Sequence, residues 1–292
     1  MLYLSREHSH SKGCSLNRFG EFQKCFLYAE KWRKWKMTVN EKIAKIRERM
    51  AENHIDAVIV PSADPHMSEY YSEHWKTRAW LSGFTGSAGS FVITQSVAGL
   101  WTDGRYYVQA EKQLSGSEGV LFKMNEPETP KIHEYLAKEL PENAVVGING
   151  QLFSVAYVKE MQKAFKKKNI QIDNQVDYAN DLWEDRPAES ATAVYNLPVK
   201  YAGKSAQQKI EELRSKLEAA GAEAIFVNAL DGIAWLYNIR ANDVACTPVA
   251  VAYAYVSKEN AILFTNTARV DADVLRVLSE NGITMRPYED VF

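Results

Sequence analysis

Hydrophobic and polar positions along residues 37–173 follow a period that switches repeatedly between helical and extended. Ile43, Ile46 and Met50 recur at helical spacing, and the apolar run Ile55–Val60 is typical of a buried strand. The same criteria predict helices at 105–114, 131–140 and 155–168, and strands at 91–94, 100–102, 120–124, 144–148 and 170–173. Helices and strands that alternate around one hairpin predict an α/β domain with a mixed sheet.

A glycine-rich segment precedes the hairpin. Gly83, Gly86 and Gly89 are spaced by three and separated by small or hydroxyl residues. Neither the dinucleotide fingerprint nor the Walker loop has this spacing, so the segment does not indicate a phosphate site. We expect these glycines to pack a tight turn beneath the sheet, and Gly99 to mark the bend of the hairpin.

A polar turn follows the second strand of the hairpin. Asp103-Gly104 is a turn dipeptide, and it presents Asp103 and Arg105 at the end of a strand, where α/β proteins commonly bind ligands. Two interpretations of Arg105 remain open. It forms a local ion pair with Asp103, or its guanidinium binds a carboxylate or carbonyl group of a substrate.

The second half of the chain repeats the first. Eight positions match at a constant spacing of 167 residues: Ile43, Ile46, Arg47, Met50, Ala57, Val58, Val60 and Asp64 with Ile210, Leu213, Arg214, Leu217, Ala224, Ile225, Val227 and Asp231. Leu263-Phe264-Thr265 with Arg269 also resembles Leu100-Trp101-Thr102 with Arg105. The repeat predicts two copies of one α/β domain, at 37–184 and 185–292, divided near Asp185-Arg186-Pro187. The second copy has no counterpart of 131–173, so we expect it to be incomplete at its C-terminus.

Composition narrows the class of protein. Of 292 residues 46% are hydrophobic, and the longest apolar run, Pro248–Val256, is far shorter than a membrane helix needs. The net charge of −2 does not indicate a nucleic-acid partner. Three cysteines cannot form a disulfide framework, which favours a reducing compartment. We therefore expect a cytoplasmic protein that binds neither nucleic acid nor membrane.

Residues 1–36 differ from the rest. They carry a net charge of +5 against −7 for 37–292, and they lack an apolar core of secretory-signal length. We expect a disordered or non-native leader before Met37. The alternatives are a transit peptide, a membrane-surface contact through Trp32 and Trp35, or a zinc site built from His8, His10, Cys14 and Cys25.

Several motifs together carry a family resemblance. They are VPSADPHMSEY at 60–70, RAWLSGFTGSAG at 78–89, WTDGRY at 101–106, WEDRP at 183–187 and ALDGIAWLYNIR at 229–240. Over residues 38–292 the chain resembles the N-terminal and middle domains of Xaa-Pro aminopeptidases, specifically the three-domain aminopeptidase P of the creatinase/prolidase superfamily. Ala241 stands where that family usually has Gly, and Thr247 where it commonly has Asn.

The resemblance implies where the chemistry would occur. In that family a C-terminal pita-bread domain holds two metal ions, usually manganese, through two Asp, one His and two Glu, and this sequence does not fit that set. We therefore expect no catalytic residue and no cofactor in this chain, with manganese bound by a catalytic domain that the sequence lacks. The two domains would shape the substrate entrance and contribute homodimer contacts. The alternative is a catalytically inactive module of the same fold that binds peptides or histones.

The resemblance also suggests contact residues. Glu69, Arg105, Asp231 and Arg240 are candidates for polar contacts to proline-containing peptides or to a partner subunit, with Trp80 and Trp235 as anchors. The segment 54–69 also raises the possibility of a metal site built from Asp56, Asp64, Glu69, His54 and His66. Capping or surface roles explain these side chains better, because nothing independent indicates metal binding, so we expect no metal there.

Overall fold

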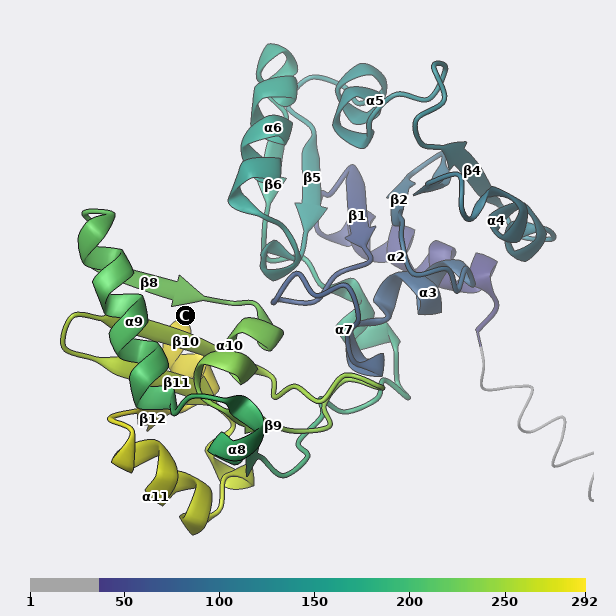
Figure 1. The fold of residues 1–292 in the computed structure, drawn as a ribbon. Coiled ribbons are helices and arrows are strands. Elements are labelled where there is room, and N and C mark those ends of the chain that lie inside the picture. The colour runs from purple at the N-terminus through teal and green to yellow at the C-terminus, as the bar shows by residue number, and fades with distance from the viewer. Residues whose placement is uncertain (1–36) are drawn as a thin grey trace, which may run out of the picture. The chain divides into compact units, whose positions relative to one another are not determined.

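Two sheets with the same internal strand order form the framework of the protein (Figure 1). The structure is a computed structural model that describes residues 37–292; the expectations for the leader at 1–36 lie outside the described residues. Residues Val39–Phe292 form one compact unit.

The first sheet has six strands in the order β4-β3-β2-β1-β5-β6. Its strands are β1 (Ala57–Pro61), β2 (Ser90–Thr94), β3 (Ala98–Thr102), β4 (Gly119–Lys123), β5 (Val145–Ile148) and β6 (Gln171–Asp173). β1, β2 and β3 pair antiparallel, whereas β4, β5 and β6 each join parallel to a neighbour. The predicted mixed sheet is confirmed.

Helices cover both faces of this sheet. They are α2 (Val39–Glu52), α3 (Thr77–Ser82), α4 (Tyr107–Leu114), α5 (Ile132–Glu139), α6 (Val155–Phe165) and α7 (Tyr178–Leu182), with 3-10 turns η1 (Glu73–Trp75), η2 (Gly150–Leu152) and η3 (Lys166–Lys168). Because strand side chains alternate in direction, Val58 packs in a core with α2, α3 and α4, whereas its neighbours Ala57 and Ile59 pack in a second core with α5 and α6.

The second sheet has four strands in the order β12-β11-β10-β8. Its strands are β8 (Ala224–Val227), β10 (Ala252–Ser257), β11 (Ala261–Thr265) and β12 (Thr284–Arg286), and β7 (Tyr195–Asn196) pairs separately with β9 (Ile239–Arg240). The accompanying helices are α8 (Val199–Ala202), α9 (Ala206–Ala219), α10 (Leu230–Leu236) and α11 (Ala272–Glu280), with turns η4 (Thr267–Arg269) and η5 (Tyr288–Val291). The order and the strand directions repeat those of β4-β3-β2-β1.

Three pairs of equivalent side-chain hydrogen bonds support the internal repeat. Lys42 Nζ donates to the Trp80 carbonyl at 2.7 Å, and Lys209 Nζ donates to the Trp235 carbonyl at the same distance. Arg47 and Arg214 each donate Nε to the carbonyl of the last residue of a strand, at 2.8 and 2.9 Å. Thr102 and Thr265 likewise bond to the carbonyls of Ala88 and Val251. The spacing of 167 residues that relates α2 to α9 is therefore structural.

The glycine segment forms the expected tight turn. Gly83 ends α3 with φ 72°, a conformation that glycine adopts without strain. A Cβ on Gly86 would lie 2.2 Å from the Phe84 ring, and the buried Arg78 guanidinium donates to both the Phe84 and the Gly86 carbonyls. The expectation for Gly99 was wrong. It lies inside β3, paired with Val92, because the hairpin turns at 95–97 and the Trp101 and Phe122 rings leave no room for a side chain.

Candidate functional site

The loop at 61–76 between β1 and α3 carries several polar and aromatic side chains. Asp64 is buried, and its Oδ1 accepts the backbone N–H groups of His66 and Ser68 at 3.1 and 2.7 Å. The chain therefore turns sharply here, as expected for an aspartate that caps its own loop. Beyond this turn Met67 and Tyr70 are 50% and 62% exposed, and Glu69 is also exposed.

Arg105 lies on the adjacent turn after β3. Its Nε and Nη2 each donate to the Asp103 carboxylate at 2.9 Å, and its side chain is 68% exposed. The hydrogen bonds to Asp103 raise the pKa of Arg105 and lower that of Asp103, and the charge of Glu69 also favours the guanidinium cation. The local ion pair is thus present, and it fixes an exposed cation within electrostatic reach of Glu69.

The remaining candidates lie in the second repeat, apart from Trp80. Asp231 is exposed in the first turn of α10, where its Oδ1 accepts the Gly232 N–H. Arg240 Nη1 donates to the Ala234 and Ile239 carbonyls, so its guanidinium is hydrogen-bonded to the backbone at the C-terminal end of α10. Trp235 is 54% exposed beneath the Lys209 ammonium group, at 4.5 Å from the ring centroid.

Trp80 has a different environment from Trp235. Its ring stacks on Trp183, with centroids 5.3 Å apart, and the Lys42 ammonium group lies 4.7 Å from its centroid. Of the polar candidates, Glu69 lies close enough to Arg105 for its charge to act on the guanidinium. The structure brings Trp235 and Arg240 together on α10 and β9, a second location in the fold.

Sequence reasoning missed one cluster, around Arg269. Its guanidinium forms a buried ion pair with Asp243 and donates to Thr265 Oγ1 at 2.8 Å and to the Val251 carbonyl at 2.6 Å. Asp243 also accepts the Ser190 and Thr192 hydroxyls at 3.0 and 2.7 Å. The only signal in the sequence was the alignment of Arg269 with Arg105.

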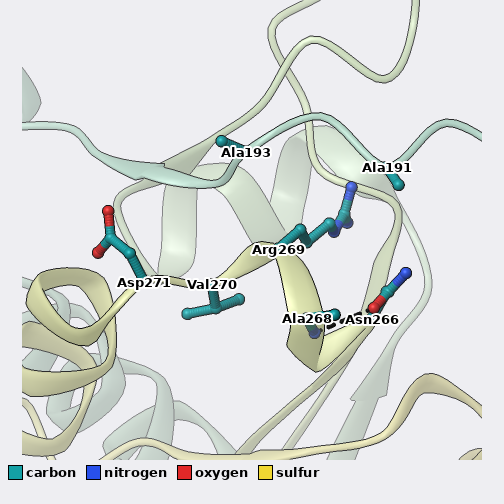
Figure 2. A pocket seen from close by; sticks show the side chains of 7 residues that line it. All are labelled: Ala191, Ala193, Asn266, Ala268, Arg269, Val270 and Asp271. Atoms are coloured by element: carbon teal, nitrogen blue, oxygen red, sulfur yellow. Dashed lines mark hydrogen bonds between the residues drawn. The ribbon is translucent and has the colours of Figure 1, made fainter.

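A cavity of about 430 Å³ lies beside this cluster (Figure 2). It is lined by Ala191, Ala193, Asn266, Ala268, Arg269, Val270 and Asp271. The Arg269 guanidinium is committed to internal partners, and Asn266 accepts the N–H of Ala268 at 3.1 Å. The cluster therefore joins the segment 190–194 to the second sheet, which is a structural role.

Metal binding does not fit the polar loop. Asp56 accepts the Val145 N–H, Asp64 caps the loop, and both ring nitrogens of His66 have protein partners. Across residues 37–292 no group of three or more His, Cys, Asp or Glu side chains is placed to hold a metal ion. Within the same residues, none of the helices has the length and apolar character needed to cross a membrane.

Comparisons with known proteins agree with the repeat. The family model for the creatinase/prolidase N-terminal domain matches residues 42–179, and a second model of the same description matches 185–292. Aminopeptidase P2 of Arabidopsis thaliana is 39% identical over 261 residues, which covers 88% of this chain and 37% of that protein. A probable Xaa-Pro aminopeptidase P of Laccaria bicolor is 41% identical, covering 87% of this chain and 40% of its own length.

One solved structure matches nearly the whole described region. The X-prolyl aminopeptidase of Caenorhabditis elegans, described as a cytosolic enzyme with a di-nuclear active site, superimposes with a TM-score of 0.83 at 30% identity. The match covers 87% of this chain and 43% of that one. The chain thus spans about two fifths of the length of these relatives.

Proposed function

The chain belongs to the creatinase/prolidase family, and from this we propose that it forms the non-catalytic N-terminal part of an Xaa-Pro aminopeptidase. Such an enzyme removes the first residue of peptides that carry proline second. The observation that supports the proposal most strongly is the match of both repeats, in one chain, to a solved X-prolyl aminopeptidase with a TM-score of 0.83. The place of action that we propose is the cytoplasm.

We assign the two repeats a role in substrate access and in homodimer contact. Glu69, Tyr70 and Arg105 are exposed, and the charge of Glu69 acts on the Arg105 guanidinium, so these residues offer a carboxylate, an aromatic ring and a guanidinium to a ligand. A free peptide N-terminus is cationic and a peptide C-terminus is anionic, so Glu69 and Arg105 suit a peptide at both ends. Asp231, Arg240 and Trp235 are proposed as contacts on the second repeat.

The bond-breaking step would depend on residues beyond these repeats. Relatives of this kind would use a divalent metal, which we expect to be manganese, and residues 37–292 offer no ligand set for it. We therefore derive no step of the cleavage through side chains of the described region.

A chimera tests the proposal. Residues 37–292 would replace the matching 261-residue stretch of Arabidopsis aminopeptidase P2, and cleavage of an Xaa-Pro peptide would be measured with added manganese. We expect metal-dependent cleavage by the chimera and none by the 292-residue chain alone. A chimera that folds, binds manganese and leaves the peptide intact would contradict the proposal, and binding of histone or uncleaved peptide by the chain alone would then favour the inactive module.

A further inference from the structure

The glycine segment at 83–89 contacts the start of α4 through Tyr106. The Tyr106 hydroxyl is 2.7 Å from Ser87 Oγ, and the Tyr106 ring meets the Phe84 ring edge to face, with centroids 5.8 Å apart. A Cβ on Gly86 would lie 2.8 Å from Tyr106 Cδ1 and 2.2 Å from the Phe84 ring, so glycine is the residue that leaves room for both rings. The segment therefore provides a fitted space for one tyrosine side chain.

A buried arginine holds the glycine segment in place. Arg78 is 2% exposed, and its guanidinium donates to the carbonyls of Phe84 and Gly86 and, through Nε, to Ser62 Oγ at 2.9 Å. Charge-assisted hydrogen bonds of this kind are stronger than those between neutral groups, so they fix the backbone of the segment. Because Ser87 follows Gly86 in the chain, the hydroxyl that contacts Tyr106 is fixed by the same contacts.

The ring of Tyr106 also lies against the guanidinium of its neighbour, Arg105. Arg105 Cζ is 5.2 Å from the centre of the ring, within the range of a cation–π contact. Asp103 binds the same guanidinium through Nε and Nη2. An exposed ion pair alone restrains a long side chain only weakly. The tyrosine ring adds a second contact to this cation, and the glycine segment holds that ring.

The Arg105 guanidinium keeps hydrogen-bond donors for a ligand. It has five N–H donors, of which Nε–H and one on Nη2 bind Asp103. Within residues 37–292 its side chain makes no further hydrogen bond, so three donors remain on a side chain that is 68% exposed. A guanidinium that is ordered before binding loses less conformational freedom when it binds a carbonyl or carboxylate oxygen.

The second repeat provides an internal comparison. Arg269, the arginine that follows β11, is succeeded by Val270 instead of a tyrosine, and its side chain is 3% exposed. The connection between β8 and β10, at 228–251, contains a single glycine, whereas the equivalent connection at 62–89 contains three. The exposed arginine therefore occurs in the repeat that has both the glycine segment and the tyrosine.

We propose that Tyr106 is a positioning residue: the glycine segment at 83–89 fixes its ring, and the ring orders the Arg105 guanidinium for binding a carbonyl or carboxylate oxygen of a peptide. The ordering requires only the contacts described above. Its consequence for peptide binding rests on the proposed function.

Solvent exchange of the Arg105 Nε–H, measured by NMR in the 292-residue chain, tests the ordering. The resonance is assigned by its loss in Arg105→Lys. Tyr106→Leu keeps an apolar side chain against Phe84 but removes the aromatic ring from the guanidinium. We expect the exchange to become about twofold to fivefold faster, which corresponds to the loss of one exposed cation–π contact.

The adjacent tyrosine offers a matched control. Tyr107 donates its hydroxyl to the Met124 carbonyl, and the Lys123 ammonium group lies 5.5 Å from the centre of its ring. Tyr107→Leu therefore removes a tyrosine of the same helix that has other partners. We expect the exchange rate of the Arg105 Nε–H to stay at the value of the unmodified chain.

Kinetics of the chimera with peptidase activity test the consequence for peptide binding. Tyr106→Leu should raise KM for an Xaa-Pro peptide about twofold to fivefold with little change in kcat, because the contact of Arg105 to the peptide is weakened in the ground state and the transition state alike. In an Arg105→Ala background the same change should leave KM unaltered, since Tyr106 acts through Arg105. A general structural role of Tyr106 would instead lower activity in both backgrounds.

Two results would overturn the proposal. One is an Arg105 exchange rate that is the same in Tyr106→Leu and Tyr107→Leu, and the other is an equal rise in KM in the two backgrounds. If Tyr106→Leu does not fold, Ser87→Ala replaces it, because it removes the partner of the tyrosine hydroxyl and keeps the ring. We then expect a smaller increase in exchange, and an unchanged rate contradicts the proposal. A chimera without peptidase activity would contradict the proposed function but would leave the exchange measurement unaffected, so the two failures are distinguishable.

Discussion

The two repeats share a scaffold but differ in what covers it. The first sheet has a hydrophobic core on each face, with α5 and α6 completing the second one. The second sheet packs against α9, α10 and α11 on one face, whereas Phe226 on β8, which packs on Tyr253, is 49% exposed. Hydrogen bonds inside the shared scaffold are conserved between the copies, as the Lys42 and Lys209 bonds show. Divergence is therefore concentrated in the groups that surround the scaffold.

The arginines that follow β3 and β11 illustrate this divergence. Arg105 pairs with Asp103 at the surface, where water screens the pair. Arg269 pairs with Asp243 in the interior, where their side chains are 3% and 0% exposed. One arginine is exposed to solvent, and the other belongs to the interior of its repeat.

The largest effect is expected from breaking the buried pair. Arg269→Ala would leave the Asp243 carboxylate buried without its cation, at a cost of about 3–5 kcal/mol in the free energy of unfolding. Urea titration of the chain measures this cost. Asp243→Ala in combination with Arg269→Ala should cost less than the two single changes added together, because they act on one interaction. Additive costs would show that the two side chains are independent.

The next largest difference in the free energy of unfolding is expected between variants of Trp80 and Trp235, whose carbonyls accept equivalent hydrogen bonds. Trp80→Ala removes a ring that packs between Trp183 and Lys42, and we expect a loss of about 2–3 kcal/mol. Trp235→Ala removes a ring that is 54% exposed, and we expect a loss below about 1 kcal/mol. Thermal or urea unfolding of both variants makes the comparison. Equal losses would mean that Trp183 contributes nothing to the environment of Trp80.

Lys42 and Lys209 make equivalent hydrogen bonds in the two repeats, so their variants test the shared scaffold. Lys209 is 2% exposed and donates to the Trp235 carbonyl and to the buried Asn238 Oδ1. Lys209→Met removes the donor of both acceptors, one of them buried, at about 1–3 kcal/mol. Lys42 is only half-buried, and Lys42→Met should cost less. A larger loss for Lys42 in the same urea titration would reverse the inferred order of importance.

These comparisons also show which features the sequence could predict. Local periodicity placed α2 and its copy α9 because the apolar stripe of a helix is encoded within a few residues. The hairpin bend was misplaced at Gly99, since a glycine that makes room for Trp101 has the same sequence signal as one that turns the chain. The partners of His66 and of Arg269 could not be predicted. Those of His66 lie in the other repeat, and Asp243 lies 26 residues before Arg269 in the chain, so no local pattern indicates either contact.

The smallest effect on stability, and the most direct test of the divergence, is expected from Arg105→Ala. Because the side chain is exposed and its ion pair is local, unfolding of the chain should hardly change. In the chimera with peptidase activity, by contrast, loss of the guanidinium should raise KM for an Xaa-Pro peptide about threefold to tenfold with little change in kcat, because a contact to the bound peptide is lost in the ground state and the transition state alike. Arg105→Lys keeps the charge but lacks the planar guanidinium. A KM equal to that of the unmodified chimera would assign the effect to charge, whereas a KM as high as in Arg105→Ala would assign it to bidentate binding. If KM of the Arg105→Ala chimera equals that of the unmodified chimera, Arg105 only stabilises its turn through Asp103. Arg105 and Arg269 would then both have structural roles and would differ only in burial.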